Sequence, residues 1–378
     1  MVCLKVKRGL VALLSGALLM MPWAVAAASA PPTVSSLSAV VYEPQSGRVL
    51  YEKDGRTARP MASTTKLMTA LLATELLDME SIVQVPSGAV PVEGTQLGLA
   101  VGESISVRDL LAGLLLSSGN DAANALALLM DDSLPAFAQR MNARAAALGM
   151  TDSLFVTPSG LDQGGHSASA RDMALLGAAV LQKPSAAELC AAKTATVTIG
   201  GRRMTISNHN KLLRLYEGCI GLKTGFTKKS GRCLVSAATQ NGVTLVIATL
   251  NGGDYWNDHM ALYKYAFSLV RQEPLSPPIL PPVAVAGGLS GQIQPIADAA
   301  LSQVLLREER VSCRVELPAF LWAPLDAGQE IGRVTYMAGE RVLAVVPIRC
   351  AKAVPARPSP SWVSLWCRRF RQLLDALL

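Results

Sequence analysis

The sequence predicts an α/β region, followed by a small all-β domain and an amphipathic helix at the C-terminus. Strand-like patterns stand at both ends of residues 31–272 with helical patterns between them, which is typical of a two-part α/β region. A proline-dense stretch then precedes short β-type runs, and residues 362–378 repeat apolar side chains at steps of three and four. With 378 residues, 50% hydrophobic and 17% charged, the chain is predicted to form large cores.

The N-terminal segment, residues 1–30, has the three parts of a secretory signal peptide. Lys5, Lys7 and Arg8 form a basic region, an apolar run follows, and Ala28-Ser29-Ala30 is typical of a cleavage site. An N-terminal membrane helix is the alternative, but the apolar run is short and ends in small residues. We therefore expect the chain to be exported.

Residues 31–272 form the predicted catalytic region. Two strands joined by a turn at residues 44–47 open it, and a helix follows Pro60 with Ser63 at its start. The periodicity predicts helices over residues 64–72, 107–130, 135–148, 171–181 and 259–270, and strands over residues 37–42, 49–51, 195–199, 221–224, 233–238 and 243–250.

The C-terminal part is predicted as a proline-rich linker at residues 273–282, a β-rich domain at 283–354, and a second linker with a helix at 355–378. The apolar face of this helix carries tryptophan and phenylalanine, and the arginines lie mostly on the other side. A cationic helix with aromatic residues on its apolar face is typical of the lipid interface, although such a helix can also pack against its own protein.

Ser63-Thr64-Thr65-Lys66 is the first of three short motifs that can carry chemistry. A serine hydroxyl is a poor nucleophile at neutral pH and needs a base within hydrogen-bonding reach. Residues i and i+3 share a helix face, so the amine of Lys66 can take the proton of Ser63 if burial and nearby cations lower its pKa. An S-x-x-K match on its own arises by chance in a chain of this length.

The other two motifs are Ser118-Gly119-Asn120 and Lys223-Thr224-Gly225. The first supplies a hydroxyl for moving protons and a carboxamide that can bind a substrate amide or Lys66. The second supplies a cation and a hydroxyl for a substrate carboxylate, and its glycine lets a substrate lie against the strand edge. Each motif alone has an ordinary structural explanation, but the three in this order, about fifty and then about a hundred residues apart, are together specific.

The ordered motifs resemble those of the penicillin-recognising serine enzymes, which comprise penicillin-binding proteins and class A β-lactamases. The surrounding residues resemble more specifically the low-molecular-mass D-alanyl-D-alanine carboxypeptidases, strongly over residues 35–270 and more loosely beyond them. This resemblance implies a β-lactamase/penicillin-binding-protein-like fold, with a mainly antiparallel sheet flanked by helices. The similar stretches are Pro60–Thr69, Leu116–Ala123, Thr157–Asp162, Ser167–Ala174 and Gly221–Thr227.

The resemblance also implies a two-step hydrolysis that uses no cofactor and no metal. Ser63 attacks the carbonyl of the penultimate D-alanine with Lys66 as base, and backbone N–H groups stabilise the oxyanion. Ser118 passes a proton to the leaving D-alanine, and water then hydrolyses the acyl-enzyme. The residues implied to bind substrate are Asn120, Lys223, Thr224, Gly225, Thr227 and Arg171.

The partners implied by this resemblance are peptidoglycan stem peptides ending in D-Ala-D-Ala and, as covalent inhibitors, β-lactam antibiotics. Together with the export signal and the amphipathic helix, it places the expected site of action at the outer face of the cytoplasmic membrane, in the cell-wall space. One stretch departs from the family: Thr157 and Ser159 replace a frequent Asn and His, which argues against a direct catalytic role for this loop.

Three other functions remain as alternatives. A β-lactamase shares the fold and the nucleophile, but the chain shows no Glu-x-x-Leu-Asn-type loop of the class A enzymes. A D,D-endopeptidase or transpeptidase differs in its bond or its acceptor, which the motifs do not specify. A non-catalytic cell-wall protein is disfavoured because the serines and lysines of all three motifs are intact.

Charge and histidine content argue against two further classes. The net charge is +7, but lysine and arginine are scattered and form no basic stripe, so nucleic-acid binding is not expected. The three histidines, His166, His209 and His259, form no ligand-spaced pair, which disfavours a metal-dependent peptidase.

Six cysteines follow the predicted signal peptide. Cys219 with Cys233, and Cys313 with Cys350, are disulfide candidates in an exported protein because each pair brackets a predicted β-rich segment. Separate buried thiols are equally compatible, since sequence does not show the geometry of the Cβ atoms.

Overall fold

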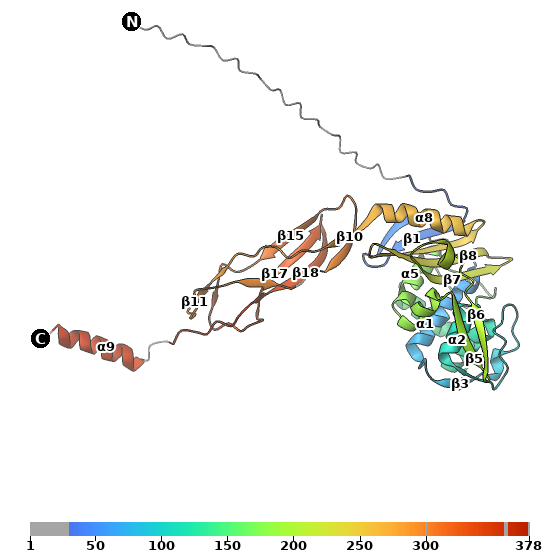
Figure 1. The fold of residues 1–378 in the computed structure, drawn as a ribbon, viewed down its shortest axis with the longest axis horizontal. Helices are drawn as coiled ribbons and strands as arrows, with labels where there is room; N and C mark the ends of the chain where they lie inside the picture. Colours follow the sequence, from blue (N-terminus) through green and yellow to red (C-terminus); the bar gives the residue numbers. More distant parts are fainter. Residues whose placement is uncertain (1–29, 299–300, 359–361, 377–378) are drawn as a thin grey trace, which may run out of the picture.

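The structure is a computed structural model that describes residues 30–298, 301–358 and 362–376. The predicted signal peptide is residues 1–30, and all of it except Ala30 lies outside the described residues. Figure 1 shows an N-terminal α/β domain, an elongated β domain and the terminal helix α9 (Trp362–Asp375) following one another along the longest axis. Within the described residues, no helix is both long and apolar enough to cross a bilayer.

The N-terminal domain is built on a five-stranded antiparallel sheet with the strand order β2-β1-β9-β8-β7. The chain first forms β1 and the edge strand β2, returns after the helices to form the other edge with β7, and completes the centre of the sheet with β8 and β9. This leaves one side of β7 without a neighbouring strand in the sheet. The strands are β1 (Ser38–Glu43), β2 (Arg48–Lys53), β7 (Cys219–Thr227), β8 (Gly231–Gln240) and β9 (Val243–Gly252).

Helices cover both faces of this sheet because its central strands are apolar on both sides. Val40 and Val246 face a large core shared with the helices between β2 and β7, whereas Val41 and Ile247 face α8 (Tyr255–Leu269). The predicted antiparallel sheet flanked by helices is thus confirmed. The remaining helices are α1 (Lys66–Leu76), α2 (Val107–Leu115), α3 (Asn120–Met130), α4 (Leu134–Ala147), α5 (Ala170–Leu181), α6 (Pro184–Ala191) and α7 (Leu212–Leu215).

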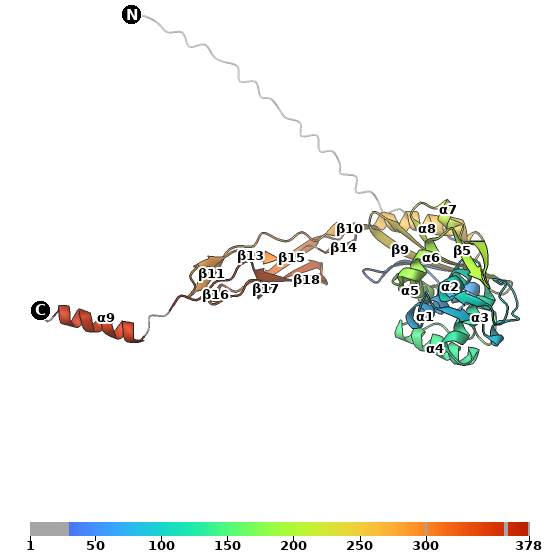
Figure 2. The same cartoon turned by 60° about the horizontal axis from the view of Figure 1, so that its bottom comes forward.

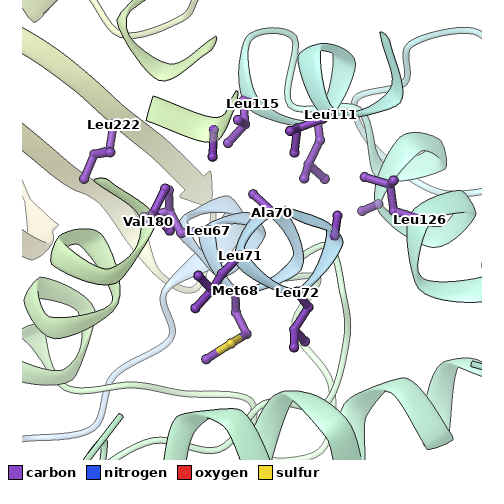
Figure 3. Close-up of a cluster of buried hydrophobic side chains, with 14 of the residues drawn as sticks. Leu67, Met68, Ala70, Leu71, Leu72, Leu111, Leu115, Leu126, Val180 and Leu222 are labelled. Carbon is purple, nitrogen blue, oxygen red and sulfur yellow. The ribbon is translucent and has the colours of Figure 1, made fainter. Parts of the chain in front are cut away.

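Helix α1 occupies the centre of the helical half and is buried from Lys66 to Ala73. Figure 3 shows side chains of α1, such as Leu67 and Leu71, among residues of the surrounding elements, including Leu111 and Val180. A helix that is apolar all round belongs inside a core, and this burial removes the freedom of its first turn to move.

The stretch 107–130, in which helical patterns predominate, forms two helices separated by the turn that carries the second motif. Helix α2 ends at Leu115, and α3 begins at Asn120 after a turn in which Ser118 has the left-handed φ of 63°. Gly119, at the N-cap of α3, breaks the helical pattern, as its low helix propensity favours.

A small four-stranded sheet and two short 3₁₀ turns complete the N-terminal domain. The strands, in the order β3-β4-β5-β6, are β3 (Ile82–Gln84), β4 (Ser104–Ser106), β5 (Thr194–Ile199) and β6 (Arg202–Ser207). The 3₁₀ turns are η1 (Ala62–Thr65) and η2 (Ser87–Ala89).

The β domain has its own hydrophobic core, which includes Val334, Tyr336 and Ile348. It consists of a four-stranded sheet, β13-β18-β17-β15, a three-stranded sheet, β12-β11-β16, and the pair β10-β14. These strands are β10 (Val270–Pro274), β11 (Val283–Ala286), β12 (Gln292–Ile293), β13 (Pro295–Ala297), β14 (Ser302–Leu306), β15 (Val311–Glu316), β16 (Phe320–Trp322), β17 (Glu330–Ala338) and β18 (Arg341–Cys350).

The two domains are joined by a pair of β-strands and by ion pairs. Strand β10 continues directly from α8 and pairs with β14, so the first residues of the predicted linker, 273 and 274, belong to a strand. Glu309 binds Arg48 of the N-terminal domain at 2.5 Å and Arg341 of the β domain at 3.2 Å. These two guanidinium groups lower the pKa of Glu309 to about 2, and the hydrogen bond from Arg48 is the largest cause.

Neither candidate disulfide is formed, and all six described cysteines are free thiols. Cys219 stands opposite Ala238, whereas Cys233 stands opposite Gly225, so the two lie on different rungs of the β7–β8 ladder. Cys313 pairs across the ladder with Tyr336, and Cys350 pairs with Pro295 at the far end of β18. A disulfide needs Cα atoms within about 7 Å, and these registers separate the partners along the strands.

Candidate active site

Ser63 lies in the 3₁₀ turn η1, which leads without a break into the buried helix α1. The preceding residue, Ala62, has the left-handed φ of 50°, which is uncommon for a residue with a side chain. Gly160 packs on this turn so closely that a Cβ there would lie 1.9 Å from the carbonyl oxygen of Ala62. The turn that carries Ser63 is therefore held from both sides, by α1 and by the loop at Gly160.

Lys66, one turn after Ser63, is completely buried, and its amine is fully occupied by three oxygen atoms. Nζ donates to Ser63 Oγ at 2.9 Å, to Asn120 Oδ1 at 2.6 Å and to the carbonyl oxygen of Ser159 at 2.7 Å. Desolvation lowers the pKa of Lys66 well below its usual value, and the positive charge of Lys223 lowers it further. Only Asp121 acts in the opposite direction.

The turn between α2 and α3 holds Ser118 and Asn120, both more than nine-tenths buried. The amide of Asn120 bridges the site to the loop before it, since Nδ2 donates to the carbonyl oxygen of Glu93 at 2.6 Å. Asp121 anchors the same loop by accepting hydrogen bonds from the backbone N–H groups of residues 97, 98 and 99. This network fixes the direction of the Asn120 oxygen towards Lys66.

Lys223 lies on β7 with its side chain buried, and Nζ donates to the carbonyl oxygen of Thr224 at 3.1 Å. Burial lowers the pKa of Lys223 to about 8, and the nearby Cys190 partly opposes this shift. Strand β7 is the edge strand, and at Gly225 it packs against the turn that carries Ser63. The third motif is thereby brought to Ser63, although it lies 160 residues away in the chain.

Gly225 packs closely against the turn that carries the nucleophile. A Cβ at this position would lie 2.9 Å from the backbone nitrogen of Ser63 and 3.0 Å from the carbonyl oxygen of Met61. The space that a side chain at Gly225 would occupy is therefore filled by the nucleophile turn. The absent side chain lets β7 pack directly against the backbone of Ser63.

Thr227 and Arg171 complete the set of predicted site residues. Thr227 ends β7, where its hydroxyl donates to Asp162 Oδ2 at 2.9 Å, so it links the edge strand to the loop that follows Gly160. Arg171 is not brought to the other residues: it lies at the start of α5 and forms an ion pair with Glu52 at 3.8 Å. Glu52 belongs to β2, the opposite edge of the sheet from β7.

Two features of the site were not predicted from the sequence. The loop at Ser159 supplies a backbone carbonyl to Lys66, so the departure of its side chains from the family pattern does not remove it from the site. His166 Nδ1 accepts from the N–H of Val156 at 2.9 Å, which leaves its Nε2 to donate to Thr65 at 2.8 Å. Burial lowers the pKa of His166 to about 4 and keeps it neutral.

The sequence contained only part of the information needed to predict these two features. The stretch Thr157–Asp162 stood out by resemblance, but a backbone carbonyl has no sequence signature. Over the described ranges, no three His, Cys, Asp or Glu side chains gather in a way that could hold a metal ion.

Comparison with known proteins agrees with this geometry. The family model described as D-alanyl-D-alanine carboxypeptidase matches residues 24–253, and the one described as penicillin-binding protein 5, C-terminal domain, matches residues 299–356. The D-alanyl-D-alanine carboxypeptidase DacB2 of Mycobacterium tuberculosis is 38% identical over 241 residues, which cover 62% of this chain and 82% of that protein.

Two longer matches extend over both domains. The D-alanyl-D-alanine carboxypeptidase DacF of Bacillus subtilis is 30% identical over 326 residues, covering 82% of this chain and 84% of that protein. The crystal structure of penicillin binding protein 5 from Haemophilus influenzae superposes with a TM-score of 0.65 and 26% identity, covering 86% of this chain and 99% of that one. The chain therefore belongs to the D-alanyl-D-alanine carboxypeptidase family, and it is a serine-type D-Ala-D-Ala carboxypeptidase that acts on peptidoglycan.

Proposed function

We propose that Ser63 is the nucleophile and that the neutral amine of Lys66 is the base that activates it. The observation that carries this proposal is the set of three oxygens around Lys66 Nζ. A neutral amine has two N–H groups and one lone pair. If Asn120 and the Ser159 carbonyl accept the two N–H groups, the lone pair is left for the hydroxyl proton of Ser63.

The reaction then proceeds in two balanced steps. Lys66 takes the proton of Ser63 as Oγ attacks the carbonyl carbon of the penultimate D-alanine, and the C–N bond breaks as the leaving D-alanine receives a proton through Ser118. Water next attacks the Ser63 ester, with Lys66 again as base, which releases the shortened peptide and restores the hydroxyl. The backbone N–H of Ser63, close to β7, is suited to stabilise the oxyanion in both steps.

The edge strand β7 is suited to bind the peptide as an added strand. Thr224 and Thr227 offer hydroxyl groups along it, and Lys223 supplies the positive charge for the terminal carboxylate. Arg171 has no place in this arrangement, because it lies beside the opposite edge of the sheet.

The effect of Lys223 on Lys66 can be tested by a pH profile. Lys223→Gln removes the positive charge that opposes protonation of Lys66, so the pKa of Lys66 rises and the acidic limb of the profile moves to higher pH. We expect this shift in the rate of acylation by benzylpenicillin, measured by stopped-flow or quenched mass spectrometry. The exposed Lys228→Gln, with the same change of charge, is the control and should leave the profile in place. An unshifted profile in Lys223→Gln would contradict the proposed coupling.

Gly225→Ala is expected to reduce kcat/KM for D-alanine release by about ten- to a hundredfold, because the added Cβ displaces the backbone of Ser63 from its position. The control is Gly291→Ala, since a Cβ at Gly291 meets no atom within 4 Å. Coupled assay of free D-alanine measures both variants. Full activity in Gly225→Ala would mean that close packing of β7 on the turn is not required.

We further propose that α9 lies in the phospholipid interface at the outer face of the cytoplasmic membrane. All described residues of this helix are exposed, and its large apolar side chains include Trp362 at 84% and Trp366 at 66% exposure. Sedimentation with anionic phospholipid vesicles is expected to carry down the chain that begins at residue 31. Removal of residues 358–378 should abolish this binding without loss of D-alanine release. Vesicle binding by the shortened chain would count against α9 as the anchor.

A further inference from the structure

The two ends of the β domain differ in what they contact. Strand β18 begins at Arg341, which shares Glu309 with Arg48 of the N-terminal domain. It ends at Cys350, so the residues that follow lie at the end of the β domain that points away from the N-terminal domain. Figure 2 shows β11 and β16 at this same end, beside the segment that leads to α9.

The chain leaves the β domain next to β16. Backbone bridges join Leu325 to Val354 and Gly288 to Ala356, and the N–H of Arg357 donates to the carbonyl oxygen of Gly287 at 2.7 Å. Strand β16 pairs in parallel with β11, and Trp322 stands opposite Ala286, the residue before Gly287. Trp322 therefore lies close to Arg357, whose contact with Gly287 is among the last described contacts of the domain before α9.

Three large apolar side chains stand exposed at this end: Leu289 at 62%, Phe320 at 50% and Trp322 at 69% exposure. We call them the distal apolar tip. The rings of Phe320 and Trp322 meet edge to face at 5.6 Å, and their neighbours on β11 are the small side chains of residues 284 and 286. Charged groups of both signs surround this end: the exposed Lys352, Arg357, Asp326 and Glu330, and the ion pair of Arg349 with Asp298.

The connection between this tip and α9 is short. Five residue steps separate Arg357 from Trp362, and an extended chain spans at most about 18 Å over that number. If α9 lies in the lipid interface, Arg357 is held within this distance of Trp362, and the tip lies beside the strand residues that Arg357 contacts. Tryptophan and phenylalanine are favoured at that depth, because the headgroup region accepts both an apolar ring and a polar N–H.

We propose that the distal apolar tip inserts into the same phospholipid interface as α9, so that the β domain stands directly on the membrane. This inference rests on the proposed membrane association of α9. Once α9 is bound to the membrane, the tip is held near the same surface at a high effective concentration. A small apolar area is then sufficient for the tip to bind as well. The two contacts together fix the orientation of the β domain, which the contact through α9 alone does not.

The depth of Trp322 in the bilayer tests this proposal. In the chain that begins at residue 31, Trp256, Trp362 and Trp366 are replaced by phenylalanine, which leaves Trp322 as the only tryptophan. We expect vesicles of phosphatidylethanolamine and phosphatidylglycerol, brominated near the glycerol end of the acyl chains, to quench Trp322 fluorescence at least about twofold. Bound protein whose Trp322 is not quenched would overturn the tip proposal and leave the α9 proposal standing. Absence of sedimentation with vesicles would overturn both.

A paired variant provides a second measurement. Phe320→Ser with Trp322→Ser is expected to weaken vesicle binding about tenfold and to leave D-alanine release from a soluble peptide unchanged. The control is Ile82→Ser, because Ile82 is 69% exposed on the N-terminal domain, and it should not alter binding. If instead the paired variant changes the molecular mass in lipid-free sedimentation and not the vesicle affinity, the tip is a surface for self-association and the proposal is wrong.

Discussion

Ser63→Ala abolishes D-alanine release from a peptide ending in D-Ala-D-Ala, with kcat/KM reduced by at least about 10⁴-fold. The reason is that Ser63 supplies the one hydroxyl among the described residues that hydrogen-bonds to Lys66 Nζ, whose remaining partners are the Asn120 oxygen and a backbone carbonyl. The same variant should form no covalent adduct with benzylpenicillin, whereas the unchanged chain should carry one adduct that maps to Ser63.

The control for this experiment is Ser104→Ala, an exposed serine on β4 that takes the same loss of a hydroxyl. Thermal unfolding should show that Ser63→Ala remains folded, because the hydroxyl makes one hydrogen bond in a partly exposed position. D-alanine release that survives in Ser63→Ala would refute the proposed acyl-enzyme.

Lys66→Met has the second largest expected effect, a loss of about 10³- to 10⁴-fold in the rate of acylation. Methionine fills a similar volume but has no lone pair that can take the proton of Ser63. Because the buried amine carries a strongly lowered pKa, the unchanged enzyme should gain activity as the pH rises through that pKa, and Lys66→Met should lack this rise. The pH dependence of adduct formation measures both effects.

Lys53→Met is the matched control for this prediction. Like Lys66, Lys53 donates hydrogen bonds to backbone carbonyl oxygen, in this case to the oxygens of Val34 and Ser36. It lies at the β2 edge of the sheet, away from the nucleophile. The control is expected to lower stability slightly and to leave the pH profile unchanged. A Lys66→Met variant with the normal rate and pH rise would show that another group is the base.

Most of the fold was predictable because its signals are local. The apolar periodicity of residues 134–147 and 170–181 needs only one helix face, and both helices begin within one residue of the predicted position. The helical patterns of residues 107–130 predicted helices there, whereas the exact place of the break between α2 and α3 depends on the backbone conformation at Ser118. The disulfide candidates failed for a related reason, since strand register decides which cysteines meet.

Within the active site, the sequence predicted which residue types are present and the family to which they point, and the comparisons confirm that family. Ser63 and Lys66 meet as predicted because positions three apart on a helical turn share a face. Arg171 had a sequence context that resembled the family, but the helix that carries it begins at the far edge of the sheet.

The order of the three motifs could be read from the chain alone, because residue identity and helical spacing are local properties. Only the tertiary structure packs β7 against η1 and buries Lys66 away from water. It places Lys223 where its positive charge lowers the pKa of Lys66. It also gave Gly225 its role in packing and the Ser159 carbonyl its contact with the base. These features arise from burial and from contacts between distant segments, and no local pattern encodes how much water or charge will surround a given side chain.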